Sequence, residues 1–174
     1  YLEGLITERE FLESIQYKES WRFPWIHYKV FFELAKKNNF RIIALNSEGS
    51  ISERDKKAAE VICQHIPSGH DYLFILFGEL HILPDKLPKK VREKSSKQFR
   101  DIIVHQNLEN LYWNIYEQSE QDASKSLVVK FSDHEFSLQN SPPWIKYESM
   151  IYWYENLCDD PEFDLHDYII ETGL

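Results

Sequence analysis

Hydrophobic and polar positions recur along the chain at two periods, one typical of helices and the other of strands. Apolar residues at helical spacing predict helices, with a capping box at Thr7 and Glu10, Pro24 in the first turn of the second helix and Asn38-Asn39 at its end. These helices are expected over residues 8–16, 24–37, 52–66, 84–93, 108–118 and 144–157, with a further turn or two near 164–171. Short apolar runs predict buried strands over residues 40–45, 72–77 and 101–104. Two more strands, 127–131 and 135–138, are expected to form a hairpin around Ser132 and Asp133.

The order of these elements predicts the fold class. Helices separate the first three strands, and parallel strands require crossover connections of this kind. We therefore expect an α/β fold with a mostly parallel sheet, helices on both faces and the hairpin as an antiparallel edge. The chain has 174 residues and no repeat or boundary in its sequence, so we expect a single domain.

Composition and charge narrow the function classes. The net charge of -9 disfavours nucleic-acid binding, which requires a basic surface. No stretch approaches the ~18 consecutive apolar residues of a membrane-spanning helix. The two cysteines, Cys63 and Cys158, stand in apolar helical patterns and are interpreted as small core residues.

Charge is distributed unevenly along the chain. Residues 86–100 contain seven basic residues and one acid, whereas residues 155–174 contain seven acids and no Lys or Arg. Both runs are consistent with solvated helix surface. The basic run also fits a second interpretation, an anion site beside a pocket.

Polar side chains follow each of the three predicted parallel strands. Asn46 follows the first strand, Glu79 and His81 follow the second, and His105 and Gln106 follow the third. Ligand sites in open α/β sheets form at the carboxyl ends of parallel strands. We therefore expect Glu79, His81 and His105 to lie around one concavity.

The segment from Gly78 to His81 carries the clearest chemical signal. Gly78 allows a sharp turn after the strand, so that Glu79 and His81 can converge. A carboxylate and an imidazole can bind a divalent metal, although a metal site needs three or four ligands, or act as acid and base. The alternative is a Glu that caps a helix and a His that bonds a neighbouring carbonyl. The many aromatic residues fit core packing, and they also fit the apolar walls of a haem pocket.

Several segments resemble the ChaN-like haem-binding lipoprotein family, which shares a superfamily with the erythromycin esterases and the TraB/Tiki proteins. The family pattern is a strand, a Gly-acid-x-His segment and a Pro-Asp-His-Leu-Pro-like segment, which correspond here to residues 72–88. Further segments agree in order and spacing between about residues 5 and 155. They are Trp21-Arg22-Phe23-Pro24-Trp25 with Tyr28, Ile43-Ala44-Leu45-Asn46, Glu53-Arg54-Asp55 with Ala58-Ala59-Glu60, His105-Gln106-Asn107 before Tyr112-Trp113, and Pro142-Pro143-Trp144-Ile145-Lys146.

Two departures from the family pattern affect what the resemblance implies. Lys86 stands where the pattern has a second His. An earlier strand with its own Gly-Glu-x-His motif has no counterpart and would precede Tyr1. The chain is therefore expected to be the later part of such a domain, without its N-terminal strand–helix portion. A second copy, forming a homodimer, or the absent segment is expected to cover the apolar surface left open.

The resemblance implies a haem- or metal-binding protein with a role in haem or iron uptake. The resemblance implies haem or another small molecule as the partner, but it does not assign the family's haem ligand to a residue of this sequence. We expect the cofactor to bind at the strand ends, where His81, His105, Gln106, Asn46 and Lys86 are the candidate residues. Glu79 and His81 are the metal-ligand and catalytic candidates. A bacterial lipoprotein or periplasmic location is implied, and a cytoplasmic one stays open.

Two alternatives remain beside haem or metal binding. One is a hydrolase of the same superfamily that uses Glu79 and His81 in metal-assisted or acid–base catalysis. The other is a catalytically inert binding or structural protein, which the Lys at position 86 favours.

Overall fold

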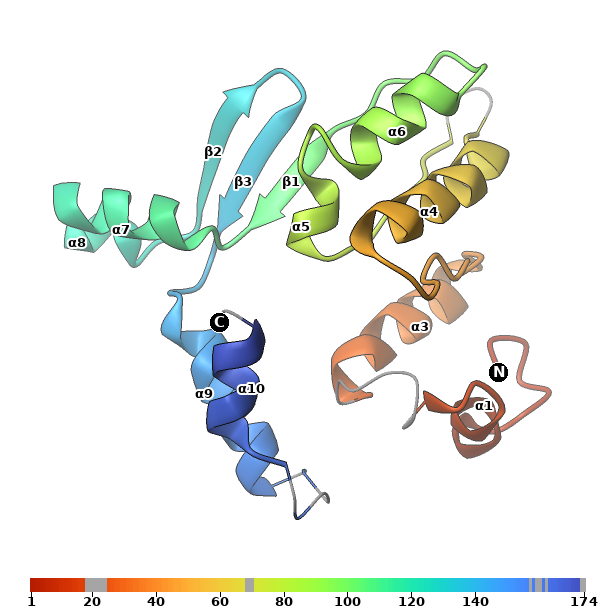
Figure 1. Cartoon of the computed structure of the whole chain (residues 1–174), viewed down its shortest axis with the longest axis horizontal. Helices are drawn as coiled ribbons and strands as arrows, with labels where there is room; N and C mark the ends of the chain where they lie inside the picture. Colours follow the sequence, from red (N-terminus) through yellow and green to blue (C-terminus); the bar gives the residue numbers. More distant parts are fainter. Residues whose placement is uncertain (18–24, 68–70, 157, 159–160, 162, 173–174) are drawn as a thin grey trace. The chain divides into compact units, whose positions relative to one another are not determined.

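The computed structural model describes residues 1–17, 25–67, 71–156, 158, 161 and 163–172, and its elements are shown in Figure 1. In chain order they are α1 (Glu8–Ser14), α3 (Ile26–Asn38), α4 (Ile51–His65), α5 (Glu79–Ile82), α6 (Leu87–Lys94), β1 (Ile103–Gln106), α7 (Glu109–Gln118), α8 (Glu120–Ala123), β2 (Leu127–Ser132), β3 (Glu135–Gln139), α9 (Trp144–Asn156) and α10 (Leu165–Thr172). The chain divides into two compact units, Tyr1–Ile43 with Glu148–Leu174, and Ala44–Tyr147. None of the helices in the described ranges is both long and apolar enough to span a membrane.

Helix positions follow the local capping signals closely. Thr7 and Glu10 form the expected capping box at α1, in which each side chain bonds the backbone N–H of the other residue. Asn39 ends α3 in the left-handed conformation.

The capping box of α4 is formed by Ser50 and Glu53, so the helix begins earlier than Ser52. The hydrogen bonds that the Ser50 hydroxyl and backbone N–H donate to the Glu53 carboxyl lower the pKa of this carboxyl. The expected helix-starting role of Pro24 falls outside the described residues.

An aromatic cluster characterises the N-terminal part of the first unit. Tyr1 stacks on Phe11 with ring centroids 5.2 Å apart, and Trp25 and Phe32 lie with centroids 4.8 Å apart. The ring of Tyr17 meets Trp25 edge-on at 5.5 Å and is only 7% exposed. Burial, with a smaller contribution from Tyr28, raises the pKa of Tyr17 to about 12. These contacts pack the aromatic rings of the N-terminal segment, α1 and α3 against one another.

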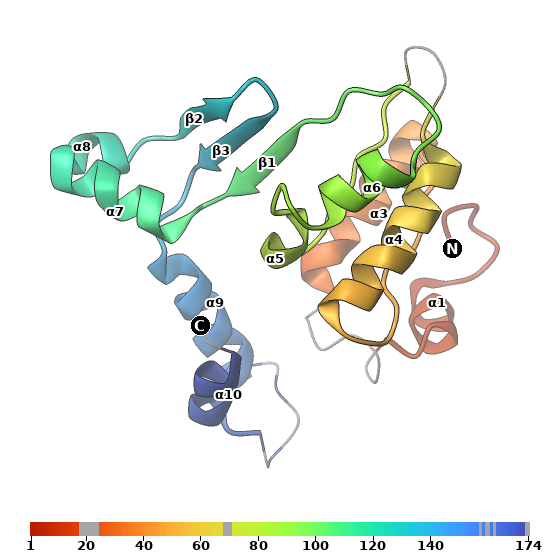
Figure 2. The ribbon, with the colours of Figure 1, turned by 45° about the horizontal axis from the view of Figure 1, so that its top comes forward.

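The sheet of the second unit differs from the expected one. It has three strands in the order β1-β3-β2, with β1 parallel to β3 and β2 antiparallel to β3, as Figures 1 and 2 show. The hairpin is confirmed, but it supplies the central strand rather than an edge alone. The prediction of a mostly parallel sheet is wrong, and only the coarse α/β class holds.

Two of the predicted strands are not strands. Residues 40–45 and 72–77 have no regular structure, and Tyr72, Phe74 and Leu76 are 84%, 87% and 65% exposed. Apolar character favours burial, but a strand also needs a neighbour that accepts and donates its backbone hydrogen bonds. No described strand pairs with either segment. The apolar pattern alone could not reveal this missing neighbour.

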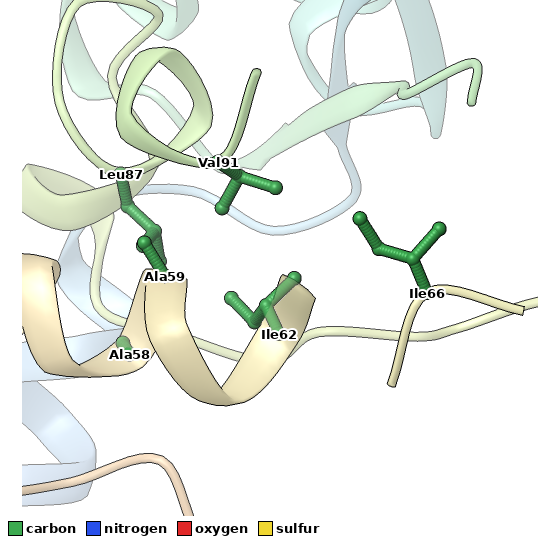
Figure 3. Packing of buried hydrophobic residues seen from close by; sticks show 6 residues of the cluster. All are labelled: Ala58, Ala59, Ile62, Ile66, Leu87 and Val91. Carbon is green, nitrogen blue, oxygen red and sulfur yellow. The ribbon is translucent and has the colours of Figure 1, made fainter. Parts of the chain in front are cut away.

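The hydrophobic core of the second unit lies between α4 and α6, which pack against each other. Figure 3 shows Leu87 and Val91 of α6 directed toward Ala59 and Ile62 of α4. Leu45, Phe77 and Cys63 pack at the margin of this cluster. Both cysteines are half-buried and form no disulfide among the described residues, and burial raises the pKa of the Cys63 thiol. This cluster anchors the helices that carry the candidate site.

Replacing Ile62 with valine should lower the free energy of unfolding by about 1 kcal/mol, because it removes one buried methylene from this cluster. Urea denaturation followed by circular dichroism measures the change. The matched control is the same substitution at Ile102, which is 56% exposed and should change stability by less than about 0.5 kcal/mol. Equal effects at the two positions would contradict the assignment of the core.

Candidate functional site

His81 lies in α5, a short helix that begins directly after Gly78. Its imidazole Nδ1 lies 2.5 Å from Oδ1 of Asp55, a residue of α4 that is 26 positions away in sequence. Asp55 is fully buried and His81 is 7% exposed. The ring of Phe77 meets the imidazole edge-on with centroids 4.4 Å apart. The pair therefore joins α4 to α5 inside the protein, and the Phe77 ring packs against the edge of the imidazole.

Glycine is not required for the turn at position 78. Gly78 has φ of -62°, which any L-residue adopts, and a Cβ there would meet His81 Cδ2 at 3.7 Å, an ordinary contact. The expectation of a special glycine turn is therefore wrong. The segment turns because α5 begins here, with Gly78 as its N-terminal cap residue and Glu79 as its first helical residue.

Lys90 of α6 completes the charge environment of the pair. Its ammonium Nζ lies 3.7 Å from Oδ2 of Asp55, within ion-pair distance but beyond a hydrogen bond. Asp55 thus faces a histidine through one carboxylate oxygen and a partly exposed ammonium through the other. A fully buried carboxylate needs such partners, because removing a charge from water is costly.

Asp55 was not among the residues singled out for the site, although the sequence contains a signal for it. Asp55 stands three, four and seven residues before Ala58, Ala59 and Ile62, on the apolar face of α4. An acid on the buried face of an amphipathic helix indicates a paired buried charge. The identity of its partner required the tertiary structure.

The hydrogen bond to Asp55 determines what His81 can do chemically. A carboxylate only accepts, so Nδ1–H is the donor, and in the neutral imidazole this leaves the Nε2 lone pair available. No hydrogen bond involves Nε2 within the described ranges. A carboxylate bonded to one ring nitrogen is the arrangement that orients metal-binding histidines. The same arrangement also orients a general base.

His105 forms a second carboxylate–histidine pair. Its Nε2 lies 2.9 Å from Oε1 of Glu135, a neighbour on β3, and the imidazole is 3% exposed. Its other nitrogen, Nδ1, is buried and has no hydrogen-bond partner among the described residues. His105 therefore faces the protein interior, on the same buried sheet face as Ser137 and Gln139.

The other residues expected at the strand ends lie in different settings. Gln106 is exposed on the opposite face of β1 from His105, because successive side chains of a strand alternate between its faces. The Asn46 amide oxygen accepts a hydrogen bond from Arg54. Lys86 is partly exposed, 3.6 Å from the carboxylate of Asp85. The structure does not bring these three side chains to His81 through any hydrogen bond or ion pair in its described part.

Glu79 lines an open cavity of about 520 Å³ in the second unit. Neither His81 nor His105 is part of its wall. The other lining residues are Asn107, Leu108, Glu109, Asn110, Leu111, Asn114, Phe131 and Lys146. Asn107 is already used structurally, because its amide oxygen accepts from the backbone N–H groups of Asn140 and Ser141.

The basic residues of the 86–100 run are largely neutralised. Acidic side chains lie within ion-pair distance of five of them. The pairs are Lys86–Asp85, Lys89–Glu93, Lys90–Asp55, Arg92–Asp101 and Lys94–Glu60. Lys97 donates to the carbonyl of Ile66. This pairing favours the solvated-surface interpretation of the run.

One group of three potential metal ligands occurs among the described residues, at the start of α10. Asp164, His166 and Asp167 offer ligand atoms within 4.8 Å of one another, and all three are exposed. Asp164 already caps the helix, since its carboxylate accepts from the backbone N–H groups of His166 and Asp167. Capping therefore explains the group without a metal. Neither Glu79 nor His81 belongs to such a group in the described part of the chain.

Comparison with known families identifies one match. Residues 1–58, one third of the chain, match the family described as "Haem-binding uptake, Tiki superfamily, ChaN". The match confirms the resemblance, but it covers the N-terminal segment and not the later segment around Gly78 and His81 on which the resemblance mainly depended. It includes Asp55 of the buried pair. No curated protein and no solved structure shows a significant match to the chain.

Proposed function

We propose that this protein binds haem, with His81 as the iron ligand and Asp55 as the residue that orients it. One observation carries the proposal. The imidazole of His81 is held at Nδ1 by a buried carboxylate and keeps its Nε2 lone pair without a hydrogen-bond partner in the described chain. Haem proteins hold their iron through ligands of this kind, and second-shell carboxylates raise the basicity of the ligand.

The surroundings of His81 fit a porphyrin in their chemistry. A haem pocket needs apolar walls, and large apolar side chains stand exposed directly before and beside His81 in sequence. Phe74, Leu76 and Leu80 are 87%, 65% and 62% exposed. The match of residues 1–58 to a haem-binding family supports the same ligand. Iron bound here would supply a redox-active centre, and the residues of this chain would provide its ligand and its apolar cover.

Titration with haemin tests the proposal directly. Ligation by an imidazole should produce a sharpened, red-shifted Soret band that saturates at a fixed ratio of haemin to protein. The control is the same titration with a protein that does not bind haem, at equal concentration and in a buffer without imidazole. A Soret band identical to that of haemin in buffer would reject haem binding.

A divalent metal is the second candidate ligand, because carboxylate-bonded histidines also hold zinc and related ions. It is the weaker candidate, since Glu79 and His81 provide two ligands where three or four are needed. Zinc added in the same assay distinguishes the candidates. Competition between zinc and haemin would show that they share one site, and loss of both in His81→Ala would assign that site to His81.

A further inference from the structure

Arg54 is a partly buried arginine whose guanidinium has few hydrogen-bond partners in the described part of the chain. Its guanidinium offers five N–H donors, and the only hydrogen bond that it makes within the described residues is from Nη2 to Oδ1 of Asn46, at 2.8 Å. Its Nε atom is buried without a partner. No carboxylate of the described residues lies within ion-pair distance of it, whereas most basic residues of the 86–100 run have one.

The acids nearest to Arg54 in sequence are already engaged. Glu53 accepts hydrogen bonds from the backbone and hydroxyl of Ser50, at 2.9 and 2.7 Å. Asp55 is bonded to His81 and faces Lys90. The positive charge of Arg54 is therefore not compensated by its own helix. An arginine is always charged, so the deficit cannot be relieved by loss of a proton.

A second donor without a partner lies in the loop that leads into α4. The Ser47 hydroxyl is buried and has no hydrogen-bond partner in the described chain. The preceding residue, Asn46, accepts the hydrogen bond from the Arg54 guanidinium. A planar guanidinium fork held by Asn46, with an unpartnered hydroxyl on the residue after Asn46, matches the two oxygens of a carboxylate. Buried polar groups without partners indicate a missing ligand or water.

We propose that Arg54, with Ser47 beside it and Asn46 holding its guanidinium, binds a carboxylate of the ligand that His81 holds. The proposal rests on the proposed haem binding, because it takes this carboxylate to be a haem propionate. Arg54 immediately precedes Asp55 in α4, and Asp55 is bonded to His81. One helical turn thus carries both the residue that orients the iron ligand and the residue that would bind the anionic edge of the macrocycle.

The test compares porphyrins that differ only in their carboxylates or in their metal. Haemin, its dimethyl ester and metal-free protoporphyrin IX are titrated against the wild-type protein and Arg54→Met. Loss of one charge-assisted hydrogen-bonding group should weaken haemin and protoporphyrin binding about tenfold or more. The dimethyl ester has no anionic propionate, so both proteins should bind it equally. Arg54→Lys should retain part of the affinity, because it keeps the charge but not the fork.

Arg41→Met is the matched control, since Arg41 is exposed and its replacement removes the same charge. It should leave all three affinities unchanged, and circular dichroism checks that each variant is folded. Equal loss of haemin and ester affinity in Arg54→Met would overturn the carboxylate assignment while leaving haem binding intact. Arg54-dependent binding of protoporphyrin, without an imidazole-type Soret band for haemin, would support the anion site and reject His81 ligation. Failure of the wild-type protein to bind any of the porphyrins would overturn both proposals.

Discussion

Replacement of His81 with alanine is expected to abolish the red-shifted Soret band of the haemin complex. His81 is the histidine whose Nε2 lone pair is left available by a buried carboxylate partner, and alanine offers no ligand in its place. Absorbance titration measures the result. Free imidazole added to the variant should enter the space left by the side chain and restore the band, because the rest of the pocket is retained.

The matched control for this prediction is His134→Ala. His134 is an exposed histidine of the same unit whose ring nitrogen contacts the carbonyl of Asp101. Its replacement should leave the Soret band unchanged. An unaltered band in His81→Ala, or its loss in His134→Ala, would show that His81 is not the ligand.

Replacement of Asp55 with alanine is expected to lower both stability and haem affinity. Asp55 is fully buried between His81 and Lys90, so its removal leaves the imidazole without its acceptor and the ammonium without its counter-charge. Breaking a buried pair in this way costs about 3 kcal/mol of unfolding free energy. Loss of a second-shell carboxylate typically weakens metal-ligand affinity by about 10- to 100-fold. Urea denaturation of the ligand-free protein and haemin titration measure the two effects separately.

Asp55→Asn separates the orienting role from a purely structural one. The amide retains the shape and one acceptor oxygen, so it should be more stable than the alanine variant. It lacks the negative charge, so the bound iron should have a higher reduction potential than in the wild-type protein. An unchanged potential would assign Asp55 to structure alone. Asp133→Asn, at a 79% exposed side chain, is the control and should change neither quantity.

Features that depend on neighbouring residues were predictable from the sequence. The capping box of Thr7 and Glu10 lies within one turn of α1, and Asn39 stops α3 by adopting the left-handed conformation. The hairpin of β2 and β3 follows from two short strand patterns around a polar turn. These signals depend on contacts between residues a few positions apart, so they form in the same way whatever the rest of the chain packs against.

The sheet was less predictable, because its strands need partners from distant parts of the chain. Residues 72–77 have the most strand-like composition in the sequence, yet they pair with no described strand. In the sheet that does form, the buried face carries His105, Ser137 and Gln139, whereas Val104 and Val128 on the other face are 52% and 71% exposed. Hydrophobicity therefore indicated which segments favour burial, but not which faces are covered.

In the candidate site, too, some features are predictable from the sequence and others depend on the tertiary structure. By itself the sequence determined that His81 closely follows an apolar run, and that the helix over residues 52–66 carries acids and an arginine in its first turn. Only the tertiary structure decided that Asp55 holds His81, that His105 turns toward Glu135, and that Arg54 is left without a carboxylate. The reason is physical. A buried charge must find its partner wherever the packing of α4 against α6 and α5 brings one, and that packing depends on contacts between residues far apart in the chain.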